Sequence, residues 1–355
     1  MSDIIIIGGG IAGVAAAAEL SHQAKVTLIE AESALACHAS GRSAALCEPF
    51  YGPAPVVELS LASGPGLAEA GVLSPRGVML LAPAGEDRGF ATEAESMRLQ
   101  EIDIGQAVAT VPILEPAALG RVAFGGHAQD IDTDLLIQSL ARAARSRGAD
   151  ILTSAPASAI RRVAGAWQVT MPRGDIAAPV LVNAAGPWAD RIATMAGIAP
   201  LGIVARRRSM ARIAIPGEHD MRHWPMMLGL GESWYAKPDA GAMIVSPADA
   251  DPVEPYDARA EDMTIAEGLA RYAAMVRVPV QRLLATWAGL RSFAPDGVPL
   301  YGRDAAQPGF IWFAGQGGYG FQSSLGSARF LGDLLGGRGV DPHLARALDP
   351  ARFAR

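Results

Sequence analysis

A glycine-rich turn near the start of the chain constrains its fold more than any other feature. The β-branched run Ile4–Ile7 is typical of a strand buried on both faces, and the alanine-rich run Ile11–Ser21 predicts a helix. Between them stand Gly8, Gly10 and Gly13, in the spacing GxGxxG. The first glycine permits a tight turn, the second lets a pyrophosphate approach the backbone, and the third lets the helix pack closely on the strand.

The segment that follows completes a βαβ unit suited to a dinucleotide. Lys25–Glu30 predicts a second strand, and Glu30 stands at its end, 17 residues after Gly13. A carboxylate there accepts hydrogen bonds from ribose hydroxyls and repels a 2′-phosphate, which disfavours NADP. Free N–H groups at the helix N-terminus suit the phosphates. The other candidate contacts in this unit are Ile11, Ala12 and Ala31. The unit alone leaves NAD and FAD both open.

Composition restricts the class of protein. The chain has 355 residues, which favours two domains, and 50% of them are apolar and 19% charged, as in globular enzymes. The formal net charge is −6 and the only dense basic cluster is Arg206–Arg208, so we expect no nucleic-acid partner. The chain has two cysteines, Cys37 and Cys47, and we expect both to be small buried residues. So few cysteines favour a reducing compartment. The histidines are not spaced as metal ligands are, so we expect no metal site.

The N-terminal segment predicts neither a leader peptide nor a transmembrane anchor. It lacks a basic n-region, and the apolar run 4–18 is interrupted by four glycines. The run is also shorter than the roughly 20 residues that span a bilayer. We therefore expect a cytoplasmic protein.

The remaining periodicity predicts an α/β chain of two interleaved domains. Helices are expected at 58–70, 135–144, 263–276 and 323–335, and strands at 77–82, 151–153, 166–171, 180–183 and 310–314. The runs 205–215 and 241–246 alternate as in an antiparallel sheet. We predict a Rossmann-like dinucleotide domain and an antiparallel-sheet substrate domain. The first takes residues 1–75, 132–200 and 286–355, and the second takes 76–131 and 201–285.

An acidic trio, Asp130, Asp132 and Asp134, precedes the helix expected at 135–144. The trio could form a cation site. Side-chain oxygens at a helix start also accept hydrogen bonds from its free N–H groups, and negative charge is favoured at that end. We favour helix capping over a cation site.

Several segments outside the βαβ unit resemble one family. They are residues 38–45 (HASGRSAA), 183–188 (NAAGPW), 287–291 (WAGLR) with Pro295–Gly297, and 315–322 (GQGGYGFQ). Together they resemble the D-amino-acid oxidase/glycine oxidase superfamily of FAD enzymes. Residues 207–209 and 233–241 extend the likeness across essentially the whole chain, with bacterial D-arginine dehydrogenases the most similar. The resemblance implies a two-domain flavoenzyme that binds FAD without a covalent bond.

The resemblance also implies which residues contact FAD. One segment would wrap the flavin and pyrophosphate, and a second would direct backbone N–H groups at the pyrimidine side of the flavin, where the reduced ring gathers negative charge. The first set is Ser40, Gly41, Arg42, Ser43, Ala45 and Leu46, with Ala157 and Gly186. The second set is Gly317, Gly318, Tyr319, Gly320, Phe321 and Gln322.

At the substrate end, the resemblance makes Arg208 and Arg291 a clamp for an amino-acid carboxylate, with the phenols of Tyr51 and Tyr235 beside it. A planar guanidinium matches the two carboxylate oxygens. Arg291 lies between apolar neighbours, and an arginine directed inward needs an anion. The neighbours Arg206 and Arg207 compete with Arg208 for its assignment. For both tyrosines, a packing role remains open.

The implied reaction is oxidative deamination of a D-amino acid. Hydride transfer from Cα to the flavin gives an imino acid, and water converts it to a 2-oxo acid and ammonia. No side-chain base is evident, and the D-configuration comes from the resemblance alone. Three alternatives stay open: an oxidase of glycine, sarcosine or another secondary amine that uses O₂, an NAD-linked enzyme, and a non-catalytic flavoprotein. The electron acceptor, whether a quinone, another protein or O₂, is also open.

Two positions depart from the arginine enzymes. Leu46 stands where those enzymes have a histidine, and Val78 stands where they have the glutamate that meets a cationic side chain. A buried cation without an acidic partner is unfavourable. With Cys47 and Phe50 nearby, we expect a neutral or apolar side-chain pocket and poor use of D-arginine.

Overall fold

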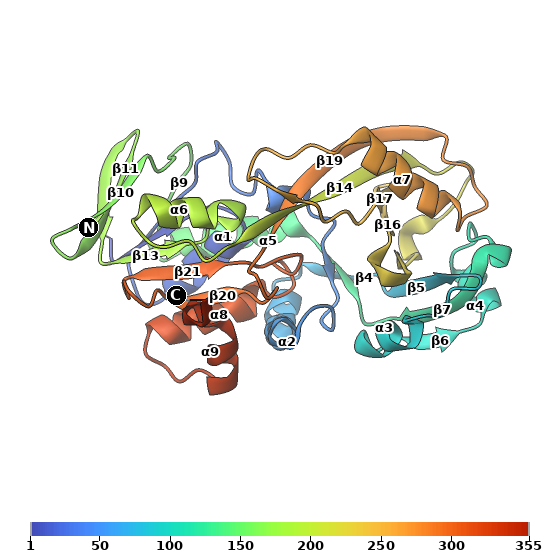
Figure 1. Ribbon diagram of the computed structural model, residues 1–355, viewed down its shortest axis with the longest axis horizontal. Coiled ribbons are helices and arrows are strands. Elements are labelled where there is room, and N and C mark those ends of the chain that lie inside the picture. The colour runs from blue at the N-terminus through green and yellow to red at the C-terminus, as the bar shows by residue number, and fades with distance from the viewer. Residues whose placement is uncertain (1, 354–355) are drawn as a thin grey trace.

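The computed structural model describes residues 2–353, which form two lobes connected by two long strands (Figure 1). One lobe is built on a six-stranded sheet in the order β20-β21-β13-β1-β2-β9. All neighbours in it are parallel except β20 and β21. Its strands are β1 (Ile4–Ile7), β2 (Val26–Ile29), β9 (Asp150–Leu152), β13 (Val180–Asn183), β20 (Leu300–Arg303) and β21 (Phe310–Ala314).

Both faces of this sheet are covered, which explains the run of four isoleucines in β1. Its side chains alternate between two apolar clusters on opposite faces, and each is at most 6% exposed. One face carries α1 (Ile11–Leu20), α5 (Thr133–Ser146) and α8 (Ser324–Leu335), and α2 (Ala54–Glu69) and α9 (Pro342–Leu348) pack beyond them. The other carries α6 (Ala189–Met195) and a small sheet of β10 (Ala159–Val163), β11 (Ala166–Met171) and β12 (Gly174–Ala178).

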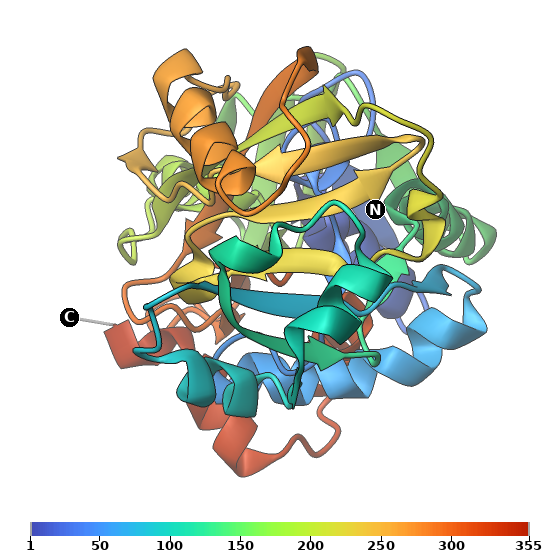
Figure 2. The same cartoon turned by 90° about the vertical axis from the view of Figure 1, so that its right-hand side faces the viewer.

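The second lobe is a mainly antiparallel sheet, onto which Figure 2 looks from the side that α4 (Ile104–Thr110) and α7 (Asp262–Ala273) cover. Its strands are β5 (Val78–Pro83), β6 (Gln100–Ile102), β7 (Leu119–Gly125), β14 (Val204–Ala214), β15 (Met226–Gly229), β16 (Tyr235–Asp239), β17 (Ala242–Ser246), β18 (Pro252–Val253) and β19 (Arg282–Phe293). A short helix, α3 (Phe90–Ser96), and a three-stranded sheet of β3 (Leu46–Cys47), β8 (Gln129–Ile131) and β4 (Leu73–Pro75) lie beside it. We propose that the two lobes are the two domains expected from the sequence.

The predicted α/β architecture and its βαβ unit are confirmed. The helix expected from residue 58 begins earlier, at Ala54, and contains Pro65. Capping of α5 is also confirmed, because Asp132 Oδ1 accepts a hydrogen bond from the Leu135 N–H at 2.9 Å. Asp130 instead forms ion pairs with arginine and lysine side chains. Across residues 2–353, no helix is long and apolar enough to cross a bilayer.

Candidate active site

A cavity of about 910 Å³ is lined by residues of both lobes and brings most of the predicted site together. The predicted cofactor residues that line it are Gly8, Gly10, Ile11, Ala12, Glu30, Ala31, Ser40, Arg42, Ser43, Ala45, Leu46, Ala157, Gly186, Gly317, Gly318, Gly320, Phe321 and Gln322. The four predicted substrate residues, Tyr51, Arg208, Tyr235 and Arg291, line it as well. Three others, Gly13, Gly41 and Tyr319, do not line it.

Two glycines of the dinucleotide turn, Gly8 and Gly13, cannot be replaced by a larger residue without moving the backbone. Gly8 has a φ of +113°, and a Cβ there would stand 2.5 Å from the carbonyl oxygen of Ala184. A Cβ on Gly13 would stand 1.8 Å from the Gly8 carbonyl oxygen, so Gly13 serves helix packing rather than direct contact. Gly10 caps α1 without a side-chain hydrogen bond. Apart from the Ile11 N–H, which Ser40 Oγ accepts, the helix start therefore keeps N–H groups for phosphates, which fits the diphosphate of FAD.

The carboxylate of Glu30 is held in place at the end of β2. Its Oε2 accepts a hydrogen bond from the Gly9 N–H at 2.5 Å, and its Oε1 accepts one from the Glu32 N–H at 2.8 Å. Glu30 also lines the cavity. A carboxylate fixed beside the glycine turn suits the ribose hydroxyls of a dinucleotide.

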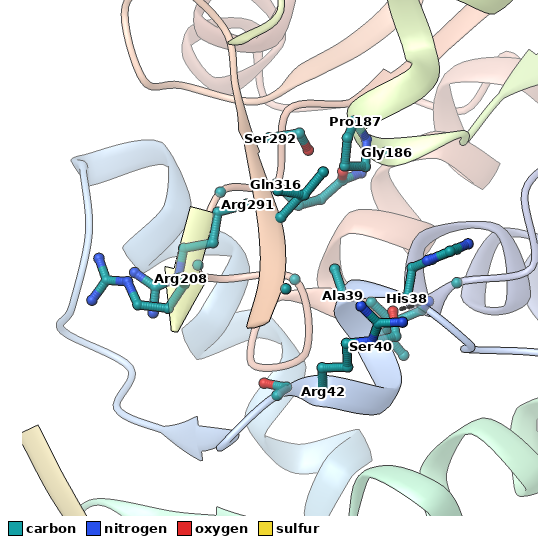
Figure 3. A pocket seen from close by; sticks show the side chains of 18 of the residues that line it. His38, Ala39, Ser40, Arg42, Gly186, Pro187, Arg208, Arg291, Ser292 and Gln316 are labelled. Atoms are coloured by element: carbon teal, nitrogen blue, oxygen red, sulfur yellow. Dashed lines mark hydrogen bonds between the residues drawn. The ribbon is translucent and has the colours of Figure 1, made fainter. Parts of the chain in front are cut away.

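The short 3₁₀ helix η1 (Ala39–Arg42) lines the cavity (Figure 3). Ser40 Oγ accepts a hydrogen bond from the Ile11 N–H at 3.0 Å. The Arg42 guanidinium donates to the carbonyls of Ala258 and Ala288, both at 3.0 Å, and pairs with Asp257 at 2.5 Å. Arg42 therefore fastens η1 to the substrate lobe in addition to lining the cavity.

The segment Gly317–Gln322 lines the cavity between the start of α1, where Gly320 lies beside Ile11, and the predicted clamp, which Gly318 meets directly. A Cβ on Gly318 would stand 2.8 Å from Arg291 Cζ. Tyr319 packs edge-on against Tyr51, with ring centroids 5.2 Å apart. The Gln322 side chain donates to the Tyr51 carbonyl at 3.2 Å, so this segment also fixes the loop that carries Tyr51. Gly317 and Gly318 therefore leave room beside the backbone for the Phe293 and Arg291 side chains.

Arg208 and Arg291 project into the cavity from the paired strands β14 and β19, as Figure 3 shows. In this pairing Arg208 stands opposite Gly289, two residues from Arg291. The Arg208 side chain is buried; among residues 2–353 its Nε has no hydrogen-bond partner, and the nearest carboxylate, that of Glu232, is 3.8 Å away. A buried guanidinium with unused donors needs an acceptor.

The two competing arginines are engaged elsewhere. Arg206 donates to the carbonyl of Ala250 at 2.9 Å. Arg207 forms ion pairs with Asp249, Asp251 and Glu261. Of the three consecutive arginines, Arg208 is therefore the one whose side chain faces the cavity.

The surroundings shift the pKa values of the clamp. Burial, and then the charge of Arg291, lower the pKa of Arg208. Burial also acts to lower the pKa of Arg291, but Tyr51, Tyr235 and Glu232 outweigh it and the pKa is raised. Burial raises the pKa of Tyr51, so this phenol stays a neutral donor. The Tyr235 hydroxyl donates to Met210 Sδ at 3.2 Å, and its ring centroid lies 5.9 Å from Arg208 Cζ.

The expected side-chain pocket is partly wrong. Leu46 and Phe50 line the cavity, but Cys47 packs into the core of the dinucleotide lobe, since successive residues of β3 point to opposite sides. Val78 is fully buried in a cluster with residues of α3, which covers it. The cavity walls here are instead Met97, Met210, Met226 and Leu228, with the carboxylates Glu48, Glu93 and Glu232. No motif in the sequence indicated these acids.

Comparison with known proteins identifies the family. The model of the family described as FAD dependent oxidoreductase matches residues 3–334. The chain belongs to this family. FAD is therefore its cofactor, which agrees with the glycine turn, Glu30 and the cavity, and the NAD-linked alternative is set aside. One similar structure, an L-α-glycerophosphate oxidase from Mycoplasma pneumoniae with FAD bound, has a TM-score of 0.82 at 19% identity.

Relatives across the family are similar to this chain. Glycine oxidase of Geobacillus kaustophilus is 26% identical over 94% of this chain and 92% of its own, and a crystal structure of that oxidase has a TM-score of 0.83. L-proline dehydrogenase from P. horikoshii has a TM-score of 0.84 at 21% identity, covering 99% of this chain and 97% of its own. Mouse mitochondrial dimethylglycine dehydrogenase is 26% identical over 65% of this chain, which spans only 28% of that protein.

Proposed function

We propose that this protein oxidises the amine of a D-amino acid whose carboxylate is held between Arg208 and Arg291. The observation that supports this most directly is Arg208, a buried guanidinium that faces the cavity with an unpartnered Nε. A carboxylate offers two acceptor oxygens in the geometry that a guanidinium binds best. The neutral phenol of Tyr51 adds a further donor beside Arg291.

FAD held at the glycine turns would accept a hydride, which is the Cα hydrogen together with two electrons. The chain's own contribution is to position the substrate. Because Gly318 lies against Arg291, the guanidinium that would anchor the carboxylate stands beside the segment Gly317–Gln322. We assign no side chain as a base. The imino acid product then reacts with water to give a 2-oxo acid and ammonia.

A second candidate substrate is glycine or an N-substituted amino acid such as sarcosine or proline. The similarity to glycine oxidase over 94% of the chain and to an L-proline dehydrogenase structure favours it. The same arginine pair would hold the carboxylate in either case. Turnover with dyes, compared with turnover in air, would show whether the electron acceptor is O₂ or another molecule, such as a quinone or a protein.

The test is an anaerobic titration of the purified flavoprotein with D- and L-amino acids, glycine, sarcosine and proline. We expect bleaching of the flavin band, at roughly 450 nm, by D-amino acids. Arg208→Lys and Arg291→Lys should each lower kcat/KM by about 10²-fold, because a displaced anchor misplaces Cα. Arg206→Lys is the matched control, because Arg206 does not line the cavity.

Three results would contradict the proposal. Faster bleaching by L-enantiomers would refute the configuration. Bleaching only by glycine or secondary amines would favour the second candidate. If no amine bleached the flavin, the protein would be a non-catalytic flavoprotein.

A further inference from the structure

The turn Glu48–Tyr51 brings one of the predicted substrate residues, Tyr51, to the cavity. Its sequence, EPFY, suits a β-turn, because proline is favoured at the second position of such a turn. The Tyr51 N–H donates to the Glu48 carbonyl at 3.1 Å, which closes the turn. Inside the turn, Glu48 Oε1 accepts a hydrogen bond from the Phe50 N–H at 3.1 Å. The position of Tyr51 therefore depends on what holds the Glu48 carboxylate.

His127, in the loop between β7 and β8, holds this carboxylate. Its Nε2 lies 2.9 Å from Glu48 Oε1 and 2.7 Å from Oε2. An ionised carboxylate only accepts hydrogen bonds, so the ring donates from Nε2. The Glu48 side chain is only 3% exposed, and a carboxylate buried to this extent needs such a partner. Burial raises the pKa of Glu48, and the charge and hydrogen bond of His127 act against this.

The backbone pairing that could hold the turn stops just before it. β3 pairs with β8 only as far as Cys47, which stands opposite Gln129. Beyond that point, the His127–Glu48 pair continues the contact between the two segments. The His127 ring also packs edge-on against Phe50, with ring centroids 5.2 Å apart. His127 thus contacts the turn at both its first and its third residue.

Gln322 holds the same turn from the dinucleotide lobe. Its side chain accepts a hydrogen bond from the Glu48 N–H at 3.4 Å and donates to the Tyr51 carbonyl at 3.2 Å. The turn is therefore supported by an amide on one side and by an imidazole on the other. The Tyr51 phenol lies beside Arg291, at the far end of a long side chain. A small shift of the turn consequently moves the phenol by a larger distance.

We propose that His127 is a positioning residue for the substrate carboxylate. Through its ion pair with Glu48, it holds the turn so that the Tyr51 phenol donates to the carboxylate at the arginine clamp. This inference rests on the proposed function, in which Tyr51 is that donor. His127 is not among the residues that line the cavity, so it acts through the turn.

The test measures the binding of propanoate, a carboxylate of the size of alanine that lacks the amine. Perturbation of the flavin absorption band gives the Kd of the oxidised protein without turnover. Tyr51→Phe should raise this Kd by about 10- to 150-fold, the range for a hydrogen bond to a charged group. His127→Leu should raise it by about 10-fold, because the phenol no longer reaches the carboxylate. His127→Gln can place an amide N–H near the position of Nε2, so it should stay within about 3-fold of wild type.

A double-mutant cycle separates positioning from a general structural role. If His127 acts through the phenol, His127→Leu in the Tyr51→Phe background should raise the Kd by less than about 2-fold. The matched control is Glu101→Gln, which breaks the exposed ion pair with Arg121 in the same lobe and should change the Kd by less than about 2-fold.

Flavin content and Tm show whether each variant is folded. His127→Leu leaves the buried charge of Glu48 without its partner, which can prevent folding. Glu48→Leu combined with His127→Leu removes both polar groups together and carries the test in that case. This combination should give the same rise of about 10-fold in the Kd, with the same dependence on the Tyr51 phenol.

The outcomes are distinguishable. Equal rises in the Kd for His127→Leu in both backgrounds would overturn the inference, as would unchanged binding in His127→Leu. A rise in His127→Gln as large as in His127→Leu would also overturn it, because the hydrogen bond to Glu48 would then not be the cause. If propanoate did not bind the wild-type protein, the inference would fall, while flavin bleaching by D-amino acids would still uphold the proposed function. If no amino acid bleached the flavin but propanoate binding depended on His127 and Tyr51 as expected, the proposed function would fall and the inference would stand.

Discussion

Replacing Gly318 by alanine tests the position of the anchor without disturbing the fold. Gly318 has a negative φ, so alanine is not strained there. Its Cβ would stand 2.8 Å from Arg291 Cζ and 3.0 Å from Nη1. Ordinary carbon contacts lie at about 3.5–4.0 Å, so the guanidinium must move by about 1 Å. It is the flexible end of a side chain, and the movement costs little stability.

A displacement of this size has a defined kinetic cost. A misplacement of about 1 Å lowers kcat/KM by about 10²-fold, or about 2.7 kcal/mol of transition-state stabilisation. We expect Gly318→Ala to show this loss in anaerobic flavin reduction, with flavin content and Tm within error of wild type. The matched control is Gly64→Ala in α2, where a new Cβ meets nothing within 4 Å. Unchanged kcat/KM in Gly318→Ala would refute the assignment of Arg291 as anchor.

Three other predictions concern the rest of the chain. Gly13→Ala places a Cβ 1.8 Å from the Gly8 carbonyl oxygen, so the purified variant should lack flavin absorbance, and full FAD occupancy would contradict this. Arg207→Met leaves the carboxylate of Asp249, which is 6% exposed, without its cation. A denaturant titration should therefore show the free energy of unfolding lowered by about 3–5 kcal/mol. No change would refute a structural role for Arg207. The expectation of a buried cysteine is confirmed for Cys47 and wrong for Cys37, which is exposed. Burial, and then Glu48, raise the pKa of Cys47 from 9.0 to about 11. A thiol reagent at pH 8 should therefore label Cys37 alone, and reaction of both thiols would contradict this. The unfolded thiol loses its proton first, so this group's contribution to stability is complete below pH 9.0 and falls as the pH rises toward about 11.

Local patterns predicted the dinucleotide half of the site. Gly8, Gly13 and Glu30 belong to one short segment of the chain. Within such a segment, the sequence pattern predicts the strand, the turn and the helix directly. The resemblance supplied Arg208 and Arg291, which lie 83 residues apart in the sequence. Their proximity comes from the pairing of β14 with β19, which no single segment encodes.

The substrate wall could not be predicted because it depends on packing between distant elements. Val78 was expected to line the cavity, but α3 covers it. The sequence did not predict Glu48 on the cavity wall. Its carboxylate pairs with His127, which is 79 residues away and follows a different strand. Glu232 follows Gly231 in a turn where both have positive φ, and nothing in the local sequence shows that this turn faces Arg208.

The pairing of β14 with β19 has a consequence for how such a protein diversifies. Arg208 and Arg291 both lie on the paired strands β14 and β19, which extend from one lobe to the other (Figure 1). The pairing of the strands therefore fixes the distance between the two arginines. Glu48 and Glu232 come from separate short segments, β3 with its following turn and the turn after β15. Under the proposed function, the two arginines that hold the substrate carboxylate therefore lie on different elements from the acidic side chains of the cavity wall. Substitutions at those wall positions could then change which substrate side chain is accepted without displacing the two arginines.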